Sequence, residues 1–180
     1  MILSSPVSAR VREAVLIQVT DPAIGIMKTL DGIRLRDGLI DPRIYLIDFT
    51  PGKAQFFESA LGPDDLEATT PVKYPLCTLA VSRATNKNIE KNRTFSGVVY
   101  LDLIFHLSWS QNKAPEKAEI YPDAFEEACF FCFNDPHNQG WATPLVYNGD
   151  LDFVRSPVMA GKGENFRQSM KAALTFEVSE

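Results

Sequence analysis

The feature that most limits how this chain can fold is a long alternation of apolar and polar side chains between Thr94 and Trp109. Every second position there is apolar, namely Val99, Leu101, Leu103, Phe105, Leu107 and Trp109. The intervening positions include Tyr100, Asp102, His106 and Ser108. Because successive side chains of a β-strand point to opposite faces of its sheet, the pattern predicts a long strand with one buried face.

Segments on both sides of this strand predict the rest of the fold. Further strands are expected at 43–49, 74–81, 145–153 and 172–178, where β-branched, aromatic and leucine residues gather between turn signals. A helical element interrupted at Asp21-Pro22 is expected at 6–31, closed by Asp31-Gly32, and a second helix at 122–133. This order predicts an α+β fold with a mostly antiparallel sheet and helices packed on it.

A chain of 180 residues with 45% apolar and 23% charged residues suits a single domain over 1–180. Residues 52–73 include Gly62-Pro63 and Thr69-Thr70-Pro71, so we expect an irregular insertion with room for one short element at 54–61. Residues 83–93 are polar and far longer than a tight hairpin turn. We expect them to project as a mobile hairpin arm.

Charge and cysteine content exclude several classes of protein. The net charge is −5 and the chain has no strong basic run, which argues against tight direct binding to DNA. Three cysteines do not make a disulfide framework, and the N-terminus lacks the pattern of a signal peptide. No apolar run approaches the roughly 20 residues needed to cross a bilayer. The simplest interpretation is a protein that folds in a reducing cytosol.

Cys129 and Cys132 have the spacing of redox and zinc motifs. They fall late in the expected helix, beside Phe125, whereas a reactive cysteine sits at an exposed helix N-terminus that lowers its pKa. Cys77 and His137 would complete four zinc ligands, but no spacing in the sequence pairs them. We therefore interpret Cys129 and Cys132 as small core side chains and predict no metal or cofactor.

No other motif predicts catalysis. His106 and His137 lie far apart and no serine occupies an elbow motif, so a catalytic triad is not indicated. The run Asn148-Gly149-Asp150-Leu151-Asp152 starts like a calcium loop but lacks the later glycine and glutamate. The run Gly161-Lys162-Gly163 lacks the spacing of a phosphate loop. We predict no catalytic residue and expect that the chain is not an enzyme.

Four stretches, taken in order, form a pattern of elements that covers most of the chain. They are the N-terminal helix, the segment 74–79 joined through a polar hairpin to 98–103, the helix 122–133, and the closing strands with 163–168 and 174–178. This pattern resembles the tail terminator (tail completion) proteins of long-tailed bacteriophages and the related neck proteins. Residues 52–73 depart from it.

The resemblance implies a structural protein of the virion that forms a ring, commonly a hexamer, on the end of the finished tail tube. The ring would stop polymerisation of the tube and provide the surface for attachment of the head or neck. Its partners would be further copies of itself, the tail tube protein and a neck or connector protein. DNA would only pass through the lumen, with no membrane involved. The protein would be assembled in the host cytoplasm and reside in the tail or neck of the virion.

The contact surface of such a ring is expected on the hairpin arm, which is basic within an acidic chain and rich in asparagine. The expected interface residues are Arg83, Asn86, Lys87, Asn88, Lys91 and Arg93. The structural alternative for this segment is a solvated hairpin tip. Two alternatives remain for function. One is a neck or stopper ring of the head–tail connector, and the other is a small cytosolic enzyme or ligand-binding domain with a pocket near His106, Cys129 and Cys132.

The alternation of the long strand generates a first prediction. Leu103→Asp places an unpaired charge on the buried face at the centre of the sheet, so we expect the domain to unfold. His106→Ala, on the more polar face, is the comparison and is expected to be mild. Circular dichroism would show the difference. A folded Leu103→Asp protein would mean that the assignment of faces is wrong by one residue.

Overall fold

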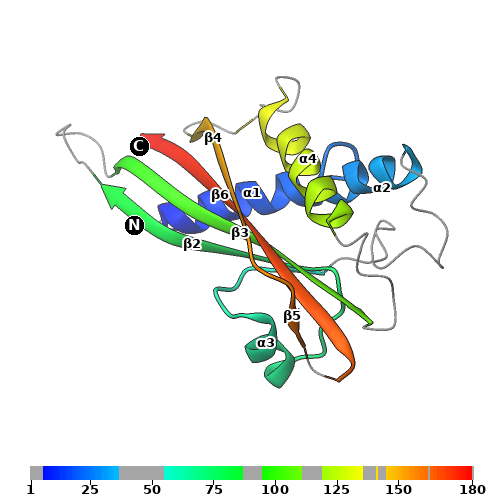
Figure 1. The fold of residues 1–180 in the computed structure, drawn as a ribbon. Coiled ribbons are helices and arrows are strands. Elements are labelled where there is room, and N and C mark those ends of the chain that lie inside the picture. Colours follow the sequence, from blue (N-terminus) through cyan, green and yellow to red (C-terminus); the bar gives the residue numbers. More distant parts are fainter. Residues whose placement is uncertain are drawn as a thin grey trace.

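A computed structural model describes residues 6–36, 55–86, 95–110, 119–135, 141, 145–161 and 163–179. It has the predicted α+β fold, in which helices cover one face of a six-stranded, mostly antiparallel mixed sheet (Figure 1). The elements are α1 (Val7–Thr20), α2 (Ile26–Arg36), β1 (Gln55–Phe57), α3 (Pro63–Thr69), β2 (Leu76–Asn86), β3 (Ser96–Ser110), α4 (Ile120–Asn134), β4 (Leu145–Arg155), β5 (Met159–Ala160) and β6 (Asn165–Ser179).

The sheet is built around one long antiparallel ladder. Its strand order is β1-β2-β3-β6-β4, and β5 pairs with β6 beyond the end of β4. β3 and β6 pair along their whole length, from Ser96 opposite Ser179 to Ser110 opposite Asn165. Among the strands that the structure describes, only β1 and β2 run parallel. The described part of the sheet therefore has β4 and β5 along one edge and the short β1 at the other.

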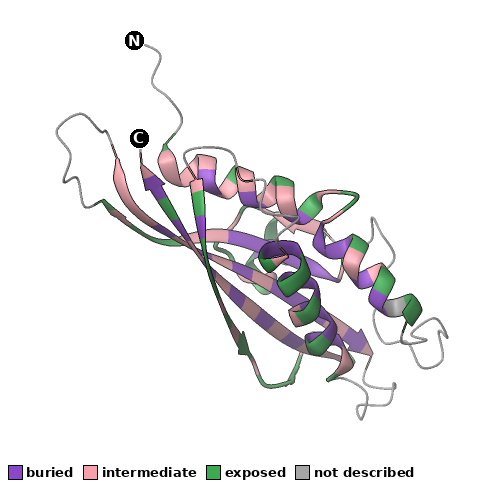
Figure 2. Ribbon diagram, turned by 90° about the horizontal axis from the view of Figure 1, so that it is seen from above, coloured by how far each residue is buried: buried purple, intermediate pink, exposed green. Residues whose placement is uncertain are grey.

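The predicted two faces of β3 are confirmed. The apolar positions from Val99 to Trp109 are each at most 3% exposed. Buried and half-buried positions alternate along the strands in Figure 2. The same parity continues on β6, whose buried residues include Ala172, Leu174 and Phe176. One sheet face is thus the core face, and the other, which we call the open face, carries Tyr100, Asp102, Ile104 and His106 on β3.

Helices α1, α2 and α4 lie against the core face (Figure 1). α1 buries Val11, Val15 and Val19, which recur every four residues along one side of the helix. α4 buries its predicted apolar side, and its Phe125 ring stacks on Phe105 of β3 with centroids 4.4 Å apart. Apolar stripes on both helices therefore meet the apolar face of the central ladder in one core.

The second N-terminal helix extends beyond its predicted end. α2 continues through Gly32 to Arg36, although Asp31-Gly32 was expected to close it. Glycine inside a helix costs about 1 kcal/mol relative to alanine. Packing outweighs that cost, since Leu30 and Ile33 are buried and the Arg36 guanidinium pairs with Glu127 of α4 at 2.9 Å.

Two other segments differ from the expectation, and one expected strand cannot be compared with the structure. The closing strand begins at Asn165, seven residues before the predicted start, because it pairs with the whole of β3. Residues 52–73 were expected to be irregular with one short element, and their described part contains both β1 and α3. The strand expected at 43–49 falls outside the described residues.

The core generates a prediction for the cysteines. Cys129 and Cys132 are fully buried, and burial raises the pKa of the Cys132 thiol to about 12, which makes it unreactive at neutral pH. Cys132→Ala removes one sulfur from a close-packed site, so we expect it to lower the free energy of unfolding by about 1–2 kcal/mol. Urea denaturation measures this change. Stoichiometric zinc in the purified protein, measured by elemental analysis, would contradict the core assignment.

Candidate functional site

The structure places only part of the expected interface. Arg83 and Asn86 lie on β2, whereas Lys87, Asn88, Lys91 and Arg93 are outside the described residues. Asn86 pairs with Gly97, and its side-chain oxygen accepts a hydrogen bond of 3.1 Å from the Ser96 amide. The arm was expected to begin at Arg83, but the ladder continues to Asn86. The connection between the strands is therefore shorter than predicted.

A β-bulge decides where Arg83 points. The register of β2 against β3 shifts between Val81 and Arg83, which leaves Ser82 as an extra residue. Arg83 consequently lies opposite Tyr100 of the open face, and its guanidinium carbon is 5.7 Å from the centre of that ring. Arg83 is exposed, so its charge is presented to solvent on the open face where β2 ends.

The expected pocket that combined His106 with Cys129 and Cys132 does not form. Phe105 points into the core and stacks on α4, the helix that carries both cysteines. The next residue, His106, therefore points to the opposite face of the sheet. The sheet itself separates the histidine from the cysteines, so they cannot share a ligand.

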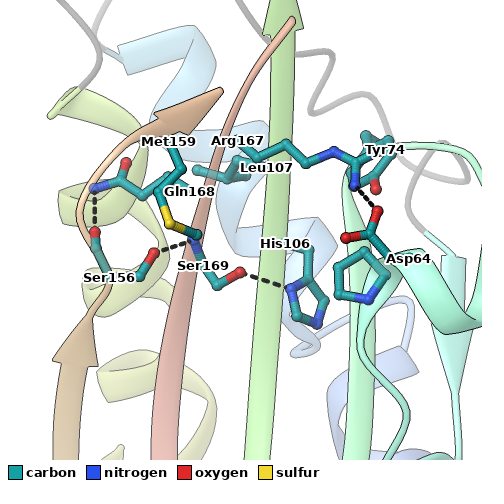
Figure 3. A pocket seen from close by; sticks show the side chains of 10 residues that line it. Asp64, Tyr74, His106, Leu107, Ser156, Met159, Arg167, Gln168 and Ser169 are labelled. Carbon is teal, nitrogen blue, oxygen red and sulfur yellow. Dashed lines mark hydrogen bonds and ion pairs between the residues drawn. The ribbon is translucent and has the colours of Figure 1, made fainter. Parts of the chain in front are cut away.

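On the open face, His106 borders a cavity of about 110 Å³ toward the C-terminal end of β3 (Figure 3). The cavity lies where β4 leaves β6 at Arg155 and the chain re-pairs as β5 at Met159. α3 contributes the opposite wall. Most of the lining surface is apolar, and the lining residues are Pro63, Asp64, Tyr74, His106, Leu107, Ser156, Met159, Arg167, Gln168 and Ser169.

His106 is held between two hydroxyl groups. Its Nδ1 lies 2.8 Å from Ser169 Oγ, and its Nε2 lies 3.2 Å from Thr78 Oγ1. The residue lies on the more polar face of the strand, as expected, but is only 5% exposed. Burial, followed by the nearby charge of Arg167, lowers the pKa of His106 to about 4. The imidazole is therefore neutral at pH 7 and links three neighbouring strands.

Arg167 joins α3 to the sheet beside the cavity. Its two terminal nitrogens each lie 2.6 Å from a carboxylate oxygen, one of Asp64 and one of Glu67. Its guanidinium carbon lies 5.4 Å from the centre of the Tyr74 ring, and the Tyr74 hydroxyl donates to Glu67 at 2.9 Å. Burial and that hydrogen bond raise the pKa of Tyr74. The charge of Arg167 is thus compensated by carboxylates of α3.

Ser156 shapes the other side of the cavity. Its amide donates to the Ser169 carbonyl, and its hydroxyl oxygen accepts from the Ser169 amide, each at 2.8 Å. The Gln168 side chain donates to the Ser156 carbonyl at 3.2 Å. The Ser156 side chain thus takes the place of a backbone carbonyl in the ladder. The Ser169 amide therefore keeps a hydrogen-bond partner at the point where the chain turns away from β6 and leaves room for the cavity.

One exposed apolar side chain lines the cavity, and two others lie next to its lining residues in sequence. Met159 lines it and is 58% exposed, Val158 precedes it, and Leu61 comes two residues before the lining residue Pro63. Asp64 lines the cavity and pairs with Arg167, and Asp65 follows it in the first turn of α3. This end of the sheet, which we call the cavity end, is therefore apolar and acidic. The exit of β2, marked by Arg83, is basic.

Among the residues the structure describes, no three His, Cys, Asp or Glu side chains form a metal-binding group. Of the helices described, none combines the length and the apolarity needed to cross a membrane. No protein-family model and no curated protein matches the chain.

The buried imidazole generates a prediction of pH dependence. The ordinary pKa of histidine is 6.5 and that of His106 is about 4, so between these values the unfolded chain binds the proton more strongly. Stability is therefore complete above pH 6.5 and falls as the pH drops toward 4, by up to about 1.4 kcal/mol per pH unit. Urea denaturation of the wild type and His106→Gln at pH 7, 5.5 and 4.5 measures it. We expect a shallower decline in the variant. Equal declines would contradict the assignment, because the other histidine is common to both proteins.

Proposed function

We propose that this chain is a structural protein of a phage virion that forms a ring capping the tail tube. The observation that supports the proposal best is the presence of two unlike surfaces on one subunit. The exit of β2 presents the exposed charge of Arg83, and the cavity end presents Leu61, Met159 and the acidic first turn of α3. Two unlike, complementary surfaces favour head-to-tail contacts between copies, and such contacts close into a ring when the rotation between copies permits.

The tail-specific part of the proposal rests on the resemblance in the sequence. The ring, commonly a hexamer in the proteins that the chain resembles, ends polymerisation of the tube and provides the surface for a neck or connector protein. Net charge of −5 suits a lumen through which DNA moves without binding. The virion protein is assembled in the host cytoplasm. A neck or stopper ring is the first alternative, since it requires the same kind of contact between copies.

A second candidate function, from another class, is binding of a small ligand in the cavity beside His106. The neutral imidazole and the Ser156 and Ser169 hydroxyls give this cavity a polar floor. The two classes differ in the size of the protein in solution. A ring would be a multiple of the 20.1 kDa chain, whereas a ligand-binding domain can remain a monomer.

The proposed ring generates a prediction for the basic residues of the expected interface. Replacing Arg83, Lys87, Lys91 and Arg93 together by serine is expected to leave the monomer folded and to weaken the contact between copies by about tenfold or more. Wild-type assembly should also weaken as salt is added, and the variant should lose most of that dependence, because exposed charges at an interface are screened by salt.

Mass photometry over a range of protein and salt concentrations measures this prediction, with circular dichroism to check folding. A quadruple variant that forms rings and caps tails like the wild type would place the contact on the sheet edges. A wild-type chain that stays monomeric at every concentration, alone and with tail tubes, would overturn the proposed function.

A further inference from the structure

We infer that the cavity beside His106 receives the side chain of Ile89 from a second copy of this chain. The inference rests on the proposed function, because it specifies which surfaces join neighbouring subunits of the ring. Four observations lead to it: the size and lining of the cavity, the charge at its mouth, the sequence of the β2–β3 connection, and the length of the strands between the two.

The cavity suits one aliphatic side chain. Its volume of about 110 Å³ is somewhat below the roughly 150 Å³ of a cavity that binds benzene. Pro63, Tyr74, Leu107 and Met159 contribute to its mainly apolar lining. The imidazole of His106 is neutral and hydrogen-bonded on both nitrogens. The two charged lining residues, Asp64 and Arg167, pair with each other at 2.6 Å. An apolar side chain smaller than an aromatic ring therefore fits without meeting a lone charge.

The mouth of the cavity indicates what should flank that side chain. Met159 of the lining is exposed, and so are Leu61 and Val158, which lie within two residues of lining residues in the sequence. Exposed apolar surface of this kind favours a protein partner over a free small molecule. The side chain of Asp64 is 70% exposed, and Asp65 follows it in the first turn of α3. A partner that carries positive charges on either side of an aliphatic residue would complement this mouth.

The chain itself contains such a segment. Between Asn86 and Phe95, Ile89 is the one large apolar residue in the sequence. Lys87 and Lys91 lie two positions before and after it, and Arg93 follows, against the single acid Glu90. An isolated aliphatic residue between lysines matches both the apolar cavity and its acidic mouth.

The length of β3 requires that the segment come from another copy. Ile89 is three residues beyond Asn86, so it lies at most about 11 Å from that anchor. Asn86 pairs with Gly97, and His106 lies nine residues further along β3, which is about 30 Å away. Ile89 cannot reach the cavity of its own subunit. The contact is therefore head-to-tail, which is the type that a ring requires.

Two variants each remove one side of this contact. Ile89→Asp removes the inserted side chain, and Met159→Lys places a positive charge at the mouth of the cavity. Ile17→Asp and Ile17→Lys are the matched controls, because they make the same two charge changes at an exposed site on α1 (63% exposed). Circular dichroism confirms folding of all four, and sedimentation velocity measures their association.

We expect each single variant to associate at least tenfold more weakly than the wild type, and both controls to associate normally. An equimolar mixture of Ile89→Asp and Met159→Lys should form one-to-one dimers and nothing larger, because only one junction in such a pair is intact. If either variant assembles like the wild type, or if the mixture stays monomeric while both proteins are folded, the inference is wrong and the ring uses another contact.

A second measurement separates this inference from the proposed function. A synthetic peptide of residues 84–95 is added to the Ile89→Asp protein, and the methyl resonance of Met159 is followed by NMR. A saturable shift that is absent with the Ile89→Asp peptide supports the inference. No shift overturns it. A monomeric wild type would overturn the ring, and the peptide would still show whether the cavity recognises the segment.

Discussion

The pairing of β3 with β6 along their full length is the interaction on which the rest of the structure depends. It aligns Leu103 with Ala172 on the core face and His106 with Ser169 on the open face. The helices need the first alignment to bury their apolar stripes, and the cavity needs the second. The cavity exists because this ladder continues past Arg155, where β4 ends its pairing with β6. The pairing register of β3 and β6 thus determines both the core and the candidate site.

Two arginines attach helices to the edge of the ladder. Arg167 of β6 holds α3, as described above. Arg155 of β4 lies 2.7 Å from a carboxylate oxygen of Asp123 and of Glu126, and 3.3 Å from one of Glu119, all on or next to α4. Glu119 and Asp123 are largely exposed and Glu126 is half-buried, so the pairs with the first two contribute little stability. Their effect is positional, because they fix which part of each helix meets the end of its strand.

Regular periodicity explains what the sequence could predict. The alternation around Leu103 and the helical spacing of Val11 and Val15 both report burial directly, so β3 and α1 were predicted from them. The first half of β6 was not predicted as a strand, because the polar residue Gln168 lies on the core face, where an alternating pattern would have an apolar residue. Alternation between Phe166 and Met170 was the available signal. The cavity could not be predicted, because its residues come from separate segments that only the register brings together.

The bulge at Ser82 divides β2 into two parts with different tolerance to change in length. Residues added or removed beyond Asn86 do not alter which side of the sheet Arg83 faces. Deletion of Ser82 would remove the bulge and leave Arg83 opposite Tyr100, whereas a continuous register that kept Ser82 would place Arg83 opposite Val99 and turn it toward the layer that contains α1. In diverging sequences, insertions and deletions should therefore accumulate in the connection and at the bulge position, while the length of β2 from Leu76 to Val81 stays constant.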